Sequence, residues 1–204
     1  MGRKSTRQTA MRVRIAAAAA RIMAEDGLDD FALAKRKAAR QLGAAATEAL
    51  PANEEIETEL RAYRALYQSA EHPVHIAGLR RIALEAMRAL ASFNPYLTGP
   101  VLKGIAGRYA QIELQLFPES PKAVELFLLD RGIPYATQEA RRYSGDRVHP
   151  ASVLQLTWGA TPLTLTVFDP RAERVALKTS QAGRVMERAG ITEVSALLRD
   201  AEPT

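Results

Sequence analysis

The sequence of 204 residues contains no cysteine, which excludes disulfide bonds and thiolate metal ligands. It also has no uninterrupted apolar stretch near the roughly 18–20 residues that a membrane span requires. The alanine run at residues 16–20 is short, is bounded by Arg14 and Arg21, and lacks the hydrophobic core of a signal peptide. We therefore expect a cytoplasmic protein with no membrane partner.

Side chains that commonly carry catalysis are scarce. The three histidines are His72, His75 and His149, and the only acid close to the first pair is Glu71. This spacing argues against a zinc site. The sequence contains neither Gly-x-Ser-x-Gly nor a Walker loop, so the nucleophile of an α/β-hydrolase and the phosphate loop of a P-loop enzyme are not expected.

What the chain does have is a basic beginning. Its formal net charge is +5, and residues 1–50 carry ten Lys or Arg against five Asp or Glu, whereas the remainder is nearly neutral. Residues 1–14 contain no acid and five basic residues, namely Arg3, Lys4, Arg7, Arg12 and Arg14. Such an arm can neutralise the phosphates of a polyanion. It is equally consistent with a solvated terminus that keeps the protein soluble.

The first half of the chain has the periodicity of four helices. We expect them from Thr9 to Asp26, from a cap at Asp29 or Asp30 to Leu42, from a cap at Asn53, and from Val74 to Phe93. The third helix is predicted to turn one apolar face to a core, consisting of Ile56, Leu60, Tyr63, Leu66 and Tyr67.

The second half of the chain has the sequence pattern of β-strands. Residues Gln111–Phe117 alternate strictly between polar and apolar side chains, which predicts a half-buried strand. A helix from Ser120 to Arg131, a strand over Ile133–Tyr143 and a hairpin around Gly159 follow. The sequence therefore predicts an α+β protein, with a helical domain at 1–94 and a small mixed α/β domain at 95–204.

The stretch that begins at Gly99 resembles the nucleotidyltransferase superfamily, in which a strand ending in Gly-Ser precedes a glycine loop and a strand with Asp-x-Asp. Here Gly99-Pro100 stands for Gly-Ser, Lys103-Gly104 and Gly107 supply the loop, and Gln111-Ile112-Glu113 stands for Asp-x-Asp. The chain also resembles a set of uncharacterised bacterial proteins that have a helical N-terminal domain before this layout.

This resemblance implies a nucleotidyltransferase-like fold and a candidate site. Glu113 would be the catalytic residue and metal ligand, and the groups near the phosphates would be Gly99, Lys103, Gly104 and Arg108. An active member would use Mg²⁺ held by several carboxylates. The first of these positions is the neutral Gln111, and the later strand over Leu163–Phe168 brings no acid before Asp169. The same alternation also fits Glu113 as an ordinary solvent-facing strand residue.

A second resemblance concerns the N-terminus. The stretch from Ile22 to Gly43 resembles the opening of the tetracycline-repressor family, in which the next helix enters the major groove of DNA. The matching stretch Ala44–Glu57 has four glutamates, a proline and no Lys or Arg, so it would repel phosphate.

We therefore expect a nucleotidyltransferase-like protein that has lost transfer chemistry and binds a nucleotide, an RNA or a protein partner. Two alternatives remain open. One is an active metal-dependent nucleotidyltransferase, and the other is a helical DNA-binding regulator.

Overall fold

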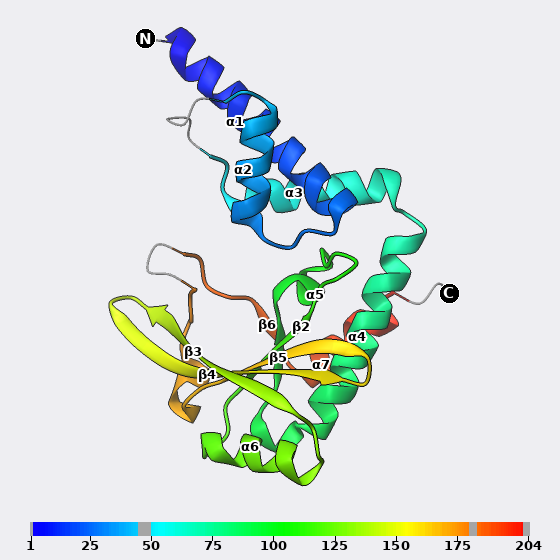
Figure 1. Cartoon of the computed structure of the whole chain (residues 1–204), viewed down its shortest axis with the longest axis vertical. Coiled ribbons are helices and arrows are strands. Elements are labelled where there is room, and N and C mark those ends of the chain that lie inside the picture. The colour runs from blue at the N-terminus through cyan, green and yellow to red at the C-terminus, as the bar shows by residue number, and fades with distance from the viewer. Residues whose placement is uncertain (1, 45–49, 180–182, 202–204) are drawn as a thin grey trace. The chain divides into compact units, whose positions relative to one another are not determined.

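The computed structural model describes residues 2–44, 50–179 and 183–201. Over these ranges the chain forms seven α-helices, concentrated at the start, and one mixed sheet of six strands, which confirms the predicted α+β class (Figure 1). It divides into two compact units. The helical unit comprises residues 1–75 and 105–110, and the sheet unit comprises residues 76–104 and 111–204. The domain ranges 1–94 and 95–204 stay a prediction, because compactness alone does not define a domain.

The helical unit is built from α1 (Gly2–Asp26), α2 (Phe31–Gln41), α3 (Asn53–Tyr67) and the first turn of α4 (Glu71–Ala89). As predicted, α2 is capped by Asp30, whose carboxylate accepts hydrogen bonds from the N–H groups of residues 32 and 33. Helix α1 begins seven residues before the expected Thr9. Its buried side chains form one core with those of α2 and α3, and this core includes Ile105 from the later segment.

Helix α3 differs from the prediction in two ways. Asn53 is the first helical residue and not the cap, and its side chain instead accepts a hydrogen bond from Lys35 (2.7 Å). The buried stripe consists of Ile56, Glu57, Leu60 and Arg64, whereas Leu66 and Tyr67 of the expected face are largely exposed. The spacing of four residues from 56 to 60 to 64 therefore defines the inward face, and it ends on a charged residue.

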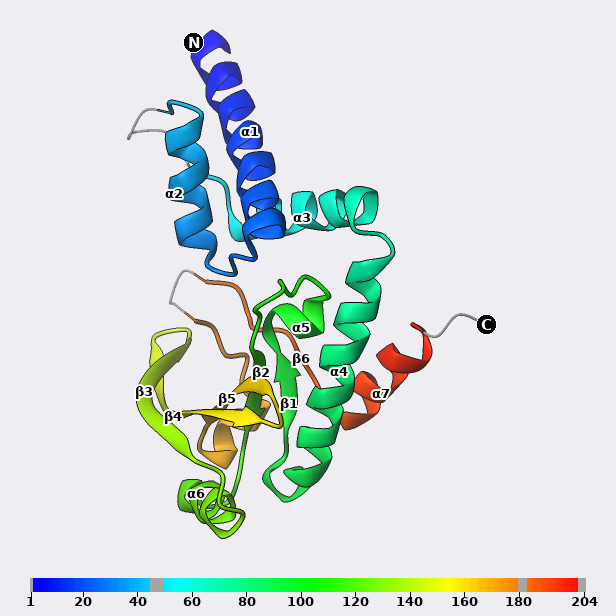
Figure 2. The ribbon, with the colours of Figure 1, turned by 45° about the vertical axis from the view of Figure 1, so that its right-hand side comes forward.

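The sheet unit contains the rest of α4 and the strands β1 (Tyr96–Thr98), β2 (Ile112–Leu116), β3 (Tyr135–Ser144), β4 (Arg147–Trp158), β5 (Thr161–Val167) and β6 (Arg188–Ala189). Its further helices are α5 (Gly99–Lys103), α6 (Pro121–Asp130) and α7 (Ile191–Arg199), with short 3-10 turns at Ala91–Phe93 and Pro170–Arg174. The strand order is β3-β4-β5-β2-β1-β6. Neighbours are antiparallel except for the central pair β2 and β5, which is parallel. Figure 2 shows α7 beside α4 and the long β3–β4 hairpin curling at its tip.

Two expectations for this unit need correction. The strand that the resemblance ends at Gly99-Pro100 stops earlier, because β1 ends at Thr98 and α5 begins at Gly99 with Pro100 in its first turn. The polar face of β2 is not uniformly solvated either, since Gln115 is 1% exposed. Its amide donates to the sulfur of Met186, which belongs to the segment that covers this face.

The centre of the sheet has one apolar and one polar face. Ile112, Leu114 and Leu116 are fully buried, and their partners on β5 are buried too, so they form the core side as predicted. Across the other face, pairing places Thr98, Glu113, Thr164 and Gln155 in one row. Among the described residues, no helix is long and apolar enough to cross a membrane.

Candidate functional site

The polar face of the sheet brings Gly99 and Glu113 together. Gly99 follows β1 with φ of +72°, and an added Cβ would stand 2.8 Å from the carboxylate carbon of Glu113. A side chain at residue 99 would thus meet both steric strain and the carboxylate. The glycine lets the backbone of the β1–α5 junction approach the acid closely.

Glu113 lies beside two neutral polar residues, Gln111 just before β2 and Thr164 on β5. Glu113 is half-buried and pairs in register with Thr164 on the parallel strand β5. The Thr164 hydroxyl donates a hydrogen bond to the amide oxygen of Gln111 (3.0 Å). The structure therefore joins one acid and two neutral groups here. Over the described residues, no group of three or more His, Cys, Asp or Glu side chains is arranged to hold a metal ion.

The loop after α5 is fixed by a residue that we did not predict. Lys103 is the last residue of α5, and Gly104 caps the helix with a left-handed φ of +68°. Arg80 donates from Nε to the carbonyl of Val101 (3.2 Å) and from Nη2 to that of Leu102 (2.8 Å). Its burial lowers the pKa of the guanidinium. Arg80 thus binds the last turn of α5, where the Val101 carbonyl also accepts the N–H of Gly104.

The cation whose charge interacts with that of Glu113 is Arg142, on the β3–β4 hairpin. Arg142 faces His149 across this hairpin. Burial lowers the pKa of Arg142, and the negative charge of Glu113 acts in the opposite direction. Arg142 Nε and His149 Nε2 are buried, and neither has a hydrogen-bond partner among the described residues. Two donor-capable nitrogens that lack an acceptor mark a place where an anionic ligand would be favourable.

The same face is hollowed two residues along β2 from Glu113. A cavity of about 290 Å³ there is lined by Gln115, Arg174, Val175, Ala176, Leu177, Val185, Met186 and Arg188. Arg188 lies over the ring of Tyr96 (4.9 Å from its centroid) and donates to the carbonyl of Glu173. Tyr96 in turn donates to the Glu173 carboxylate (2.8 Å), which holds the pKa of the phenol above its usual value. The guanidinium is thereby oriented beside the cavity.

The remaining predicted residue lies in the other unit. Arg108 belongs to the helical unit, where it lines a cavity together with His72 and His75. His72 Nε2 lies 3.4 Å from Arg64 Nη1, and His75 Nε2 lies 2.9 Å from the carbonyl oxygen of Gly107. His75 must therefore carry its proton on Nε2. These contacts explain both histidines without a zinc ion.

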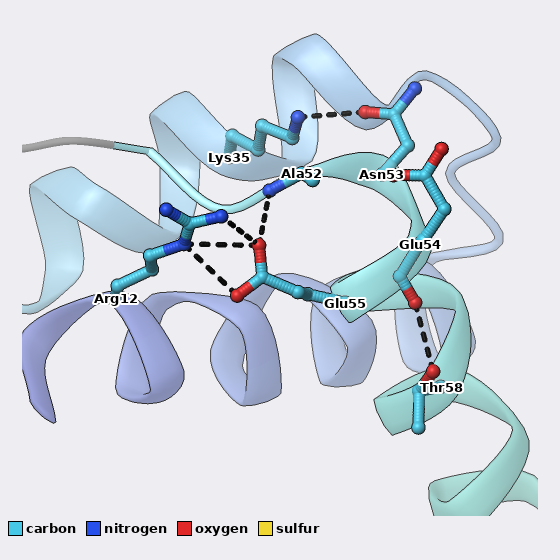
Figure 3. Close-up of polar contacts among 7 residues, drawn as sticks. All are labelled: Arg12, Lys35, Ala52, Asn53, Glu54, Glu55 and Thr58. Carbon is cyan, nitrogen blue, oxygen red and sulfur yellow. Dashed lines mark hydrogen bonds and ion pairs between the residues drawn. The ribbon is translucent and has the colours of Figure 1, made fainter. Parts of the chain in front are cut away.

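The basic start of the chain is partly engaged within the helical unit. Figure 3 shows Arg12 of α1 against the carboxylate of Glu55, with Nε 3.0 Å from both oxygens and Nη2 2.5 Å from one of them. The same carboxylate accepts the N–H of Ala52 at the start of α3 (2.7 Å). Arg12 is thus committed to an acid, which reduces what the arm offers to a polyanion.

The stretch Ala44–Glu57, expected to match a recognition helix, lies in part outside the described residues. Its described remainder enters α3, where Glu54 and Glu55 occupy the first turn. DNA binding therefore stays a prediction. Comparison of the chain with known protein families, with characterised proteins and with solved structures finds no match in any of the three.

Proposed function

We propose that this chain is a nucleotidyltransferase-like protein that binds a nucleotide on the polar face of its sheet and does not transfer it. The observation that carries the proposal is that Glu113 is the single acid beside Gln111 and Thr164, which are neutral and hydrogen-bonded to each other. Two-metal catalysis requires more negative charge than one glutamate supplies. A location in the bacterial cytoplasm, expected from the sequence, is part of this proposal.

In this proposal, arginine side chains neutralise the phosphate groups of the nucleotide in place of metal ions. Arg142 interacts with Glu113 and keeps an unpaired Nε, while Arg174 and Arg188 line the neighbouring cavity. A guanidinium matches the geometry of phosphate oxygens and remains charged without a metal. The cavity of about 290 Å³ has room for a nucleobase or a ribose. Gly99 lets the β1–α5 junction lie directly against the Glu113 carboxylate, which keeps this acid beside the polar face.

Binding of a fluorescent ATP analogue, measured in EDTA and again with Mg²⁺, tests the proposal. We expect saturable binding that EDTA does not abolish and that Arg142→Gln weakens by about tenfold, the loss of one charge-assisted contact. Arg147→Gln, on the exposed end of the same hairpin, is the matched control and should leave binding unchanged.

A transfer assay separates this proposal from the active enzyme. Radiolabelled ATP with Mn²⁺ should label neither the protein nor an added acceptor RNA. Labelling that disappears on Glu113→Gln would establish the transferase instead. Absence of ATP binding at millimolar concentration, or binding of RNA alone, would reject nucleotide binding as the function.

A further inference from the structure

The helical unit contains a second polar cavity that the proposed function does not use. Its volume is about 340 Å³, and its lining comes from α1, α3, the start of α4 and the segment 105–110. The lining residues are Ala24, Glu25, Asp26, Gly27, Arg64, Gln68, Glu71, His72, His75, Ala106, Gly107, Arg108 and Tyr109. All of them belong to this one unit. The volume suits a small metabolite.

At the wall of this cavity lies a buried cation whose hydrogen bonding is incomplete. Arg64 is 4% exposed, and its Nε has no hydrogen-bond partner among the described residues. No carboxylate of the described chain lies within ion-pair distance of its guanidinium. Burial lowers the pKa of Arg64, while the charge of Asp29 acts to raise it. A buried charge without a direct partner is costly, and a bound anion would remove that cost.

The nearest acid is held away from Arg64 by the backbone. The carboxylate of Asp29 accepts the N–H of Gly107 (3.2 Å), and an added Cβ at Gly107 would stand 2.9 Å from the same oxygen. Burial raises the pKa of Asp29, and this hydrogen bond opposes the rise. The segment 105–110 is thus pinned against Asp29, and Arg64 lines the cavity beside this segment.

The charges around the cavity favour an anion once the ion pairs are considered. Glu25 is bound by Arg21 (3.0 Å) and by the hydroxyl of Tyr63, which together lower its pKa. Asp26 is bound by Lys37 (3.2 Å). The lining then offers the two cations Arg64 and Arg108, with Glu71 as the remaining acid on the exposed side.

We infer that this cavity binds a small metabolite through a phosphate monoester group, with Arg64 as the buried anchor and Arg108 as the exposed one. A phosphate dianion can accept from the guanidinium of Arg64 and from that of Arg108 at once, because both residues line the cavity. His72 and Gln68 line the same cavity and would contact the part of the metabolite that carries the phosphate group. This site is independent of the nucleotide site on the sheet.

Isothermal titration of the full chain with ribose 5-phosphate, inorganic phosphate and ribose tests the inference. We expect ribose 5-phosphate to bind, inorganic phosphate to bind more weakly, and ribose not to bind. Arg64→Met should abolish binding of ribose 5-phosphate. Because Arg64 is buried and this variant could fail to fold, Arg108→Gln provides the second test, with an expected loss of at least fivefold.

The matched control is Arg61→Gln, an arginine on the exposed side of α3 whose carboxylate contact is the loose pair with Glu57 (3.9 Å). It should leave the affinity unchanged. Equal affinity for ribose and ribose 5-phosphate, equal losses in Arg61→Gln and Arg108→Gln, or no binding at 10 mM would overturn the inference. Arg142→Gln should not alter the binding of ribose 5-phosphate. A failure of this inference can therefore be distinguished from a failure of the proposed nucleotide site on the sheet.

Discussion

The carboxylate of Glu113 lies against the Cα of Gly99, so that a Cβ at residue 99 would be 2.8 Å from its carbon and from one oxygen. Thr98 and Glu113 are register partners on β1 and β2, which explains why the next residue meets the acid. The end of β1, the start of α5 and the candidate acid thus form one tightly fitted group.

Gly99→Ala should therefore destabilise the protein more than an alanine at an open glycine with similar φ. Gly159 is such a position, since its φ is +61° and no atom beyond its chain neighbours lies within 4 Å of the place that a Cβ would occupy. The left-handed conformation costs about 1–2 kcal/mol for a residue with a Cβ, which is the whole expected effect of Gly159→Ala. Urea unfolding would measure both losses.

The additional loss at Gly99 should come from displacement of Glu113. In the background of Glu113→Ala, the difference between Gly99→Ala and Gly159→Ala should shrink, because the displaced group is gone. Equal losses for the two alanine variants in the native background would show that the carboxylate does not restrict residue 99.

A second prediction concerns pH and the Arg12–Glu55 pair. The hydrogen bonds from Arg12 and from the N–H of Ala52 lower the pKa of Glu55 below its usual 4.5. The unfolded chain therefore binds a proton that the folded chain does not, so this stabilisation is present above about pH 5 and is lost as the pH falls through the lowered pKa. The urea midpoint of Glu55→Gln should lie below that of the native chain at pH 7, and the gap should narrow at pH 3.

Glu59→Gln serves as the comparison, because Glu59 is on the same helix and forms no ion pair with any described residue. Its midpoint should follow that of the native chain at both pH values. A gap for Glu55→Gln that is constant from pH 7 to pH 3 would contradict the assigned ionic contact.

Carboxylates placed at the two neutral positions should create a metal site. In Gln111→Asp/Thr164→Asp, two aspartates join Glu113 at the places where Gln111 and Thr164 now share a hydrogen bond. We expect Mn²⁺ to bind this variant and to raise its Tm, since bound metal would offset the repulsion among three acids. Electron paramagnetic resonance of free Mn²⁺ would measure the binding.

Adding Glu113→Gln to this variant should weaken Mn²⁺ binding, and the native chain should show no comparable site. A double variant that folds but binds no Mn²⁺ would mean that the three positions do not converge as in the nucleotidyltransferase superfamily.

The sequence predicted the regular parts of the fold because their patterns are local. The alternation of β2 places Ile112, Leu114 and Leu116 in the core, as found. The expected inward face of α4, from Ile76 to Met87, is buried too. The burial of Gln115 by Met186 could not be predicted, because Met186 lies about seventy residues later and the local sequence pattern of β2 carries no information about that contact.

The candidate sites were predicted less completely, because their charged residues act through burial. Arg64 continues the four-residue spacing of Ile56 and Leu60, and this spacing could have identified it as a buried residue. Arg80 had no such pattern. Its importance follows from its hydrogen bonds to the carbonyls of α5, which only the folded chain brings near.

The core of the helical unit has a consequence for synthesis on the ribosome. Ile105 packs with Ile15 and Leu60, and Gly107 binds Asp29, so the first seventy-five residues emerge before the side chains that complete their core. Translation proceeds at about 5–20 residues per second, so this interval lasts on the order of seconds. During that time the nascent helices lack the side chains of residues 105–110, so their apolar core stays incomplete.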